Sequence, residues 1–339
     1  MILAGDIGGT NTRLAYARVE GGRPTLVAED TFSSRDHPNL EAVLMKFVSA
    51  HRLPIAQACF GVAGPVRHGR GEATNLPWVV DSRQIAKQLD LEKALVINDL
   101  EANAYGIAAL DPKDFAVLNE GARDAEGNAA LIAAGTGLGE AGLYWDGARH
   151  RPFASEGGHA TFAPRNDLEM DLLRYLLGKH AHVSYERILS GPGLLNIYTF
   201  LRDTGRAEQP AWLAERMRGD DAPAVITQVA LEGKSTLCVQ ALDLFVSLYG
   251  AEAGNLALKV LATGGLFVGG GIAPKIIQKL KESTFITAFT AKGRMKSLLQ
   301  AMPVRVILND KTALLGAARC ATLDVAANPA PPGVRGAIR

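Results

Sequence analysis

Two patterns of apolar residues alternate along the chain. Short apolar runs, typical of buried strands, occupy residues 1–8, 14–19, 58–63, 94–99 and 304–308. Spacing typical of amphipathic or buried helices covers 40–53, 167–177 and most of 193–263, and further helices are expected from Pro274 and from Thr312. The alternation of strands and helices predicts an α/β fold.

Two segments of the chain share one plan. ILAGDIGGTNTRLAYARVEGG and LIAAGTGLGEAGLYWDG each contain an apolar strand, a glycine-containing turn, a second apolar strand and a further turn with glycine. This similarity predicts two related sheet domains facing each other, each with a glycine turn. Two such hairpins can also arise by chance in an α/β protein.

Composition narrows the class of protein. A chain of 339 residues predicts about two domains, and 47% hydrophobic with 21% charged residues is typical of a soluble globular protein. The net charge of +1 gives no reason to expect nucleic acid or a membrane as partner. Three separated cysteines, without a CxxC pair, favour a cytoplasmic protein without a zinc site or disulfides. No signal peptide or membrane span is expected.

The first glycine turn has the composition of a phosphate loop. Gly8 and Gly9 allow close approach of the backbone to a ligand, and Thr10 and Asn11 add hydrogen-bond donors. Asp6 would repel phosphate unless a hard cation lies between them, so we expect Asp6 on the Mg²⁺ side of the site, bound through water. The alternative is a tight hairpin in which Asp6 caps a turn.

Two later glycine turns offer similar cradles. One is Gly135-Thr136-Gly137, and the other is Gly269-Gly270-Gly271, which precedes an expected helix. Each could instead be a packing feature, but three such turns together favour nucleotide binding. The segment GKST at 233–236 is not a Walker A loop, because Gln228 stands where its first glycine is required.

Several polar side chains stand next to glycines or at the end of an apolar run. Asn98 and Asp99 end an apolar run, Glu156 and His159 flank two glycines, and Glu186 precedes a Gly-Pro turn. Each has a plainer explanation, such as helix capping for Asn98 or Asp99. Carboxylates, an amide and an imidazole beside phosphate loops fit a substrate with several hydroxyl groups. Phosphoryl transfer to a hydroxyl needs a carboxylate base, for which we expect Asp99.

Six motifs together resemble the bacterial glucokinase family of the actin-like sugar-kinase superfamily. They are GDIGGTNTR, INDLEANAYG, AAGTGLG, EGGHATFAP, ERILSGPGL and GGLFVGGGIAPK, in family order over nearly the whole chain. The resemblance implies two actin-like (ribonuclease H-like) α/β domains, each with a mixed central sheet flanked by helices, separated by a substrate cleft. It also implies in-line transfer of the γ-phosphoryl group of ATP to the 6-hydroxyl of D-glucose.

The resemblance also assigns roles and boundaries. It implies a small domain at 1–109 and 310–325, a large domain at 110–309, a flexible tail at 326–339 and a homodimer. It implies Asp99 as the base, and these sugar ligands: Asn75, Asn98, Asp99, Glu156, His159 and Glu186. Because the cysteines of the sister repressor/kinase group are missing, we expect no structural zinc, and we expect no helix-turn-helix before the first strand and hence no sugar-sensing repressor.

The same residues leave other functions open. The acceptor could be another hexose, or the donor could be polyphosphate. A sugar sensor without catalysis would use the same ligands but would not need Asp99. An actin-like assembly protein would have no role for Glu156, His159 and Glu186, and a dehydrogenase would require a dinucleotide loop that is out of register here.

Overall fold

The computed structural model describes residues 1–73 and 76–327, and the chain forms two compact units. Unit 1 is Met1–Leu110 together with the chain from Lys311 onward, and unit 2 is Asp111–Asp310. Each has its own sheet and its own hydrophobic core. Among the described residues, no helix is long and apolar enough to cross a membrane. The predicted α/β class is confirmed.

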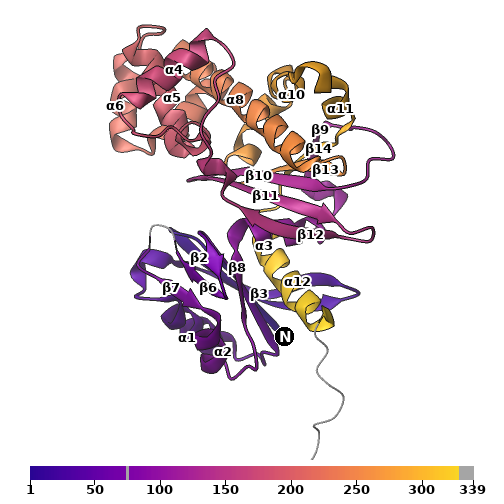
Figure 1. Ribbon diagram of the computed structural model, residues 1–339. Coiled ribbons are helices and arrows are strands. Elements are labelled where there is room, and N and C mark those ends of the chain that lie inside the picture. Colours follow the sequence, from indigo (N-terminus) through magenta and orange to yellow (C-terminus); the bar gives the residue numbers. More distant parts are fainter. Residues whose placement is uncertain (74–75, 328–339) are drawn as a thin grey trace, which may run out of the picture. The chain divides into compact units, whose positions relative to one another are not determined.

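Unit 1 is built on a five-stranded sheet in the order β3-β2-β1-β4-β8. β1 to β3 run antiparallel in succession, whereas β4 and β8 lie parallel to β1 (Figure 1). The strands are β1 (Ile2–Ile7), β2 (Asn11–Glu20), β3 (Arg23–Ser33), β4 (Gln57–Val62) and β8 (Leu95–Asn98).

Alternate residues of β1 supply two different cores. Leu3 and Ile7 pack in one cluster with α1 (Leu40–His51) and α2 (Ser82–Gln88). Ile2 and Ala4 point to the other face and pack with α12 (Thr312–Ala327), beside which lies α3 (Asp99–Ile107). A sheet buried on both faces explains the nearly continuous apolar runs in the sequence.

Unit 2 repeats this arrangement with a sixth strand. Its order is β12-β11-β10-β13-β14-β9, in which β10, β11 and β12 are antiparallel and β13 and β14 are parallel to β10. The edge strand β9 is antiparallel to β14. The strands are β9 (Phe115–Asn119), β10 (Ala129–Ala134), β11 (Leu138–Trp145), β12 (His150–Ser155), β13 (Gly265–Gly269) and β14 (Val304–Ile307).

The long helix α8 (Thr236–Val260) packs across the sheet of unit 2 (Figure 1). Its core cluster includes Ile132 and Val268 from the sheet and Phe245 and Tyr249 from the helix. The remaining helices of the unit are α4 (Asp167–Leu177), α5 (Gly191–Asp203), α6 (Ala211–Gly219), α7 (Ala222–Leu231), α9 (Ile277–Leu280), α10 (Ser283–Thr290) and α11 (Lys296–Ala301).

Most predicted elements are confirmed, but several details were wrong or missed. The helix expected from Pro274 begins as a 3₁₀ turn, Ala273–Ile276, and α9 follows it. The turn at residues 20–22 leads into β3, which was not predicted. A small antiparallel sheet of β5 (Val66–Arg67), β6 (Arg70–Glu72) and β7 (Val79–Asp81) was also missed. Of the tail expected at 326–339, residues 326 and 327 end α12, and 328–339 lie outside the described residues.

Candidate active site

The first glycine turn, residues 8–11, connects β1 to β2 and is braced by Ser34, the residue that follows β3. The N–H of Gly8 donates to the Asn11 carbonyl at 2.9 Å, and the Ser34 hydroxyl donates to the Gly8 carbonyl at 2.8 Å. Ser34 Oγ also lies 2.9 Å from Thr12 Oγ1, and both side chains are fully buried. The tip residues Gly9 and Thr10 are thus carried on a fixed base. No local sequence pattern indicates this role of Ser34.

Asp6 lies on β1 just before this turn. Its side chain shares the sheet face of Ile2 and Ala4, because alternate residues of a strand point the same way. Burial raises the pKa of the Asp6 carboxyl, and the charge of Arg13, its partner in the β1–β2 register, acts in the opposite direction. A partly buried carboxylate whose charged form is disfavoured is suited to a nearby cation.

Asn98 and Asp99 come to the same edge of the sheet as the first glycine turn. Ile7 pairs with Val62 in β4, and Val62 pairs with Asn98 in β8, with all three strands parallel. Two strand spacings separate Ile7 from Asn98, or about 10 Å. Asp99 is the first residue of α3, and its Oδ1 accepts a hydrogen bond from the Leu100 N–H at 2.9 Å.

The capping explanation of Asn98 is correct. Its Oδ1 accepts from the N–H groups of Leu100 at 2.9 Å and Glu101 at 3.3 Å, and its Nδ2 donates to the Gly64 carbonyl at 3.0 Å. Asn98 is buried. An amide group has two N–H donors, so one remains beyond the Gly64 bond. The main task of Asn98 is to fix the start of α3, and with it Asp99.

In unit 2, Glu186 lies against the second glycine turn. Its Oε2 accepts from the N–H of Leu138 at 3.0 Å, and a Cβ added at Gly137 would lie 2.5 Å from the same oxygen. Glycine at 137 is therefore required for this approach of the carboxylate. Gly135 closes the turn by donating to the Gly137 carbonyl at 2.8 Å, and Thr136 is exposed at its tip. The structure thus brings a predicted sugar ligand to a predicted phosphate loop.

Glu156 and His159 stand on a neighbouring 3₁₀ turn, Gly157–His159, and both are exposed. The chain after this turn pairs with the chain that leads to Glu186: Phe162 N–H donates to the Val183 carbonyl, and Tyr185 N–H donates to the Ala160 carbonyl. The segments carrying the three predicted ligands are therefore fixed side by side within unit 2.

The third glycine turn lies beside the second. Ala133 and Gly269 are partners in the parallel β10–β13 pair, and Gly270 leaves β13 at a φ of 82°, a conformation favoured by glycine. The buried Tyr249 hydroxyl accepts from the Ala134 N–H at 3.2 Å and lies 3.4 Å from the Gly269 carbonyl. Tyr249 thus links the start of the second glycine turn to the start of the third. The sequence did not indicate this role, because Tyr249 stands in an apolar helical run. Gly271, the last of the three glycines, is exposed.

The structure does not show the geometry of two predicted features, the Asn75 ligand and the magnesium site. Asn75 lies outside the described residues. Among the described residues, no group of three or more His, Cys, Asp or Glu side chains is arranged to hold a metal ion. Mg²⁺ held by one carboxylate, water and phosphate oxygens needs no such group.

Comparison with known proteins decides the family. The model of the glucokinase family matches residues 3–324. A glucokinase from Nostoc sp. is 43% identical over 95% of this chain and 98% of its own length. The chain belongs to the glucokinase family. It is accordingly an enzyme, a kinase that phosphorylates a sugar.

Solved structures agree with this assignment. The crystal structure of a glucokinase from an Antarctic psychrotroph superposes with a TM-score of 0.82, at 33% identity over 95% of this glucokinase chain and 98% of the other. A ROK family glucokinase from Streptomyces griseus, in complex with glucose and AMPPNP, has a TM-score of 0.65 at 21% identity, over 95% and 99% of the two chains. The second likeness shows the fold alone. The predicted actin-like class of this glucokinase is confirmed.

Proposed function

We propose that this enzyme transfers the γ-phosphoryl group of ATP to the 6-hydroxyl of D-glucose, with Asp99 as the general base. The observation that carries the proposal is the strand register Ile7–Val62–Asn98, which brings Asp99 and the first glycine turn to one sheet edge. A base must lie close to the acceptor hydroxyl while phosphate is held nearby. A separation of about 10 Å at the backbone leaves room for a phosphoryl group and a hydroxyl.

Glu156, His159 and Glu186 are proposed as ligands of the sugar hydroxyls. A carboxylate accepts hydrogen bonds at about four positions, so the Leu138 bond of Glu186 leaves capacity for hydroxyl donors. Asn98 has one amide hydrogen to offer. The Streptomyces griseus glucokinase, which holds glucose and AMPPNP in a similar fold, supports a hexose and an adenine nucleotide as ligands.

ATP is proposed to bind at the three glycine turns. The backbone at Gly9, which is partly buried, and at the exposed Thr136 and Gly270 can offer N–H groups to phosphate oxygens. Asp6 fits Mg²⁺ held through water, because burial raises the pKa of its carboxyl and a cation would favour the ionised form. Bound Mg²⁺ would neutralise charge on the phosphates of ATP.

A coupled ADP-release assay tests the function. Purified enzyme with Mg-ATP is given glucose, fructose, mannose, N-acetylglucosamine or no sugar. In a parallel series polyphosphate replaces ATP, and formation of the sugar phosphate is measured instead, because that donor yields no ADP. We expect ADP release that depends on glucose and on Mg²⁺. Release that is equally fast without sugar would contradict the proposal, as would a preference for another hexose or for polyphosphate. We also expect a homodimer, a common state of oligomeric enzymes, which light scattering after gel filtration would test.

A further inference from the structure

Two buried carboxyl groups lie together in unit 2, behind the proposed sugar ligands. Glu140 of β11 is 1% exposed and Glu252 of α8 is fully buried, and their side chains are within hydrogen-bonding reach of each other. No donor in the described part of the chain reaches Oε1 of Glu140. Two ionised carboxylates cannot donate to each other, so a proton held between the two side chains would give this poorly satisfied pair a hydrogen bond.

Glu140 contacts the segment that carries Glu156 and His159. A Cβ added at Gly157 would lie 2.0 Å from Glu140 Oε2 and 3.2 Å from Ser155 Oγ, so the Glu140 carboxyl packs directly against this glycine. The N–H of Gly157 donates to Ser155 Oγ at 2.9 Å. A movement of the Glu140 carboxyl would therefore reach the turn on which both ligands stand.

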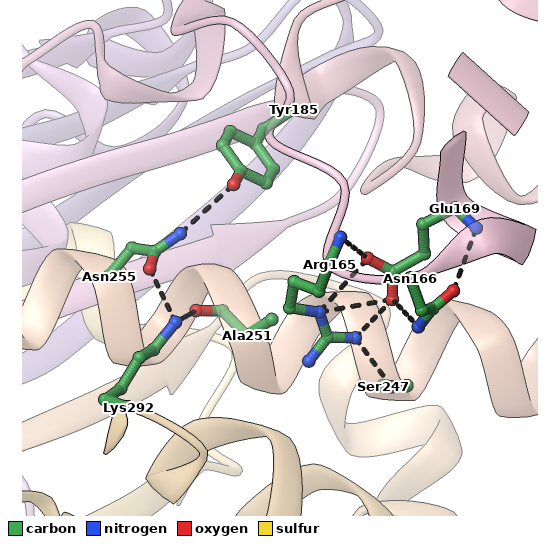
Figure 2. Close-up of polar contacts among 8 residues, drawn as sticks. All are labelled: Arg165, Asn166, Glu169, Tyr185, Ser247, Ala251, Asn255 and Lys292. Atoms are coloured by element: carbon green, nitrogen blue, oxygen red, sulfur yellow. Dashed lines mark hydrogen bonds and ion pairs between the residues drawn. The ribbon is translucent and has the colours of Figure 1, made fainter. Parts of the chain in front are cut away.

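Glu252 contacts the segment that carries Glu186. The Asn255 side chain donates to the Tyr185 hydroxyl at 3.1 Å (Figure 2). It also donates to Glu252 Oε2 at 2.8 Å, and Tyr185 directly precedes Glu186. Burial and the nearby charge of Glu252 both raise the pKa of the Tyr185 hydroxyl. The carboxyl pair thus links the two segments that carry the proposed sugar ligands.

The charges around the pair do not balance two carboxylates. Lys259 Nζ lies 3.2 Å from Glu252 Oε1, but its side chain is 53% exposed. Lys292 is bonded to the Asn255 side chain and the Ala251 carbonyl (Figure 2). Burial and the charge of Glu252 raise the pKa of Glu140 to about 7. Several titratable or charged groups face Glu140 or Glu252, directly or through the partners just named. They are Tyr249, Glu252 and Lys259 of α8, Tyr185, Lys292, Arg165 and Glu169.

We propose that Glu140 and Glu252 are positioning residues that share one proton and thereby hold the Glu156–His159 and Glu186 segments in the geometry that binds the sugar. This inference rests on the proposed function, in which those three residues are sugar ligands. When the proton is lost, two adjacent buried negative charges repel each other. Glu140 is then displaced against Gly157, and Glu252 is displaced against Tyr185, so sugar affinity falls.

Calorimetric titration with glucose, without nucleotide, tests the proposal between pH 6 and pH 9. For the unaltered enzyme we expect the Kd to rise above pH 7, by up to about tenfold per pH unit, as the protonated fraction of the pair falls. Glu140→Gln and Glu252→Gln should each give a Kd that changes little with pH. In each variant the two facing side chains can no longer both be negatively charged, so the repulsion between them is absent at every pH.

The matched control is Glu169→Gln. Glu169 is an equally buried glutamate of unit 2, but it pairs with Arg165 and Asn166 and contacts neither ligand segment (Figure 2). This variant should lose stability and keep the pH profile of the unaltered enzyme. His159 is present in every protein compared, so it cannot produce a difference between them.

The outcomes separate two kinds of failure. If the unaltered enzyme binds glucose with the same Kd throughout the range, or if both glutamine variants keep its slope, the shared-proton inference is wrong. If it binds no hexose at any pH, the proposed function fails and the inference fails with it. Should Glu140→Gln not fold, Glu252→Gln gives the same test. Infrared difference spectra of the unaltered enzyme between pH 6 and pH 9 must also show loss of a protonated carboxyl band.

Discussion

At the scale of single residues, acidic side chains of one chemical type differ in their surroundings. Asp99 stands at the start of a helix and accepts from one backbone N–H. Glu186 is partly buried and bonded to the backbone of a glycine turn. Glu140 is buried beside another carboxyl group, so its neutral form is favoured. These surroundings favour a different task for each: base, hydroxyl acceptor and proton holder.

Asp99→Asn tests the base. The amide oxygen can still accept from the Leu100 N–H, so the start of α3 is preserved while the ability to take a proton is lost. We expect kcat with Mg-ATP and glucose to fall by about 10²–10⁴-fold, with the nucleotide Kd unchanged. Asp81→Asn is the matched control, because Asp81 also begins a helix, accepting from the Arg83 N–H at 2.8 Å. A kcat within a few-fold of the original for Asp99→Asn would remove Asp99 from the mechanism.

The raised pKa of Glu140 predicts that Glu140→Gln changes the pH dependence of stability. The pKa of Glu140 is raised in the fold from 4.5 to about 7, so the folded state holds a proton that the unfolded state releases. This proton contributes at most roughly 3 kcal/mol to the free energy of unfolding. The contribution is fully present below pH 4.5 and is lost as the pH rises to 7. The melting temperature of Glu140→Gln minus that of the unaltered enzyme should therefore be larger at pH 8 than at pH 5. Melting temperatures at both pH values measure this, and an equal difference at both would contradict it.

Residues that follow a strand were easier to predict than residues that support them. Asp99 and Glu186 stand in motifs next to glycines or at the end of an apolar run. Ser34 acts on Gly8 from 26 residues away, and Tyr249 acts on Ala134 from 115 residues away. Contacts over such separations depend on the register of the whole sheet, which local patterns do not specify.

At the scale of elements, close packing of α3 against α12 places Asp99. A Cβ added at Gly316 of α12 would lie 1.7 Å from the Ala102 carbonyl oxygen of α3, and one at Gly106 of α3 would lie 2.0 Å from the Thr312 carbonyl. The obstructing atoms belong to the backbone, so they cannot turn aside. The two helices can approach this closely only with glycine at both positions.

Gly316→Ala should therefore displace α3. Overpacking of this kind typically costs about 1–3 kcal/mol, and a shift of about 1 Å at a catalytic group can lower the rate by about 10²-fold. We expect both a lower melting temperature and a lower kcat. Gly219→Ala, at the last residue of α6, is the control, because an added Cβ there meets nothing within 4 Å. Normal stability and activity of Gly316→Ala would show that α3 is not set by this contact.

Buried elements were predicted well, and edge elements were not. The helix expected at 167–177 coincides with α4, and both glycine hairpins are present. β3 was missed because only Pro24 is fully buried along it, and charged residues such as Glu29 and Asp30 interrupt its apolar positions. The strands of the small sheet are two or three residues long, too short to show a period.

At the scale of the whole molecule, the chain repeats one sheet plan and inserts one copy into the other. In both units three antiparallel strands are followed by two strands parallel to the first. Unit 2 is continuous in sequence, whereas unit 1 is completed by α12 after unit 2 has ended. The two similar glycine segments of the sequence are the first hairpins of the two sheets. Their similarity was visible in the sequence, but the return of α12 to the first sheet was not specified by any local pattern.

This connectivity predicts that the two units differ in their ability to fold alone. Residues 111–310 contain a complete core, so the fragment should unfold cooperatively in urea. Residues 1–110 alone leave Ile2, Ala4 and Ala17 without α12 and should be unstable or aggregate. Joining 1–110 to 311–327 through a flexible Gly/Ser linker should restore a cooperative transition, because the helix again covers that face of the sheet. Circular dichroism during urea unfolding compares the three proteins, and the same midpoint for 1–110 with and without the helix would show that α12 does not complete unit 1.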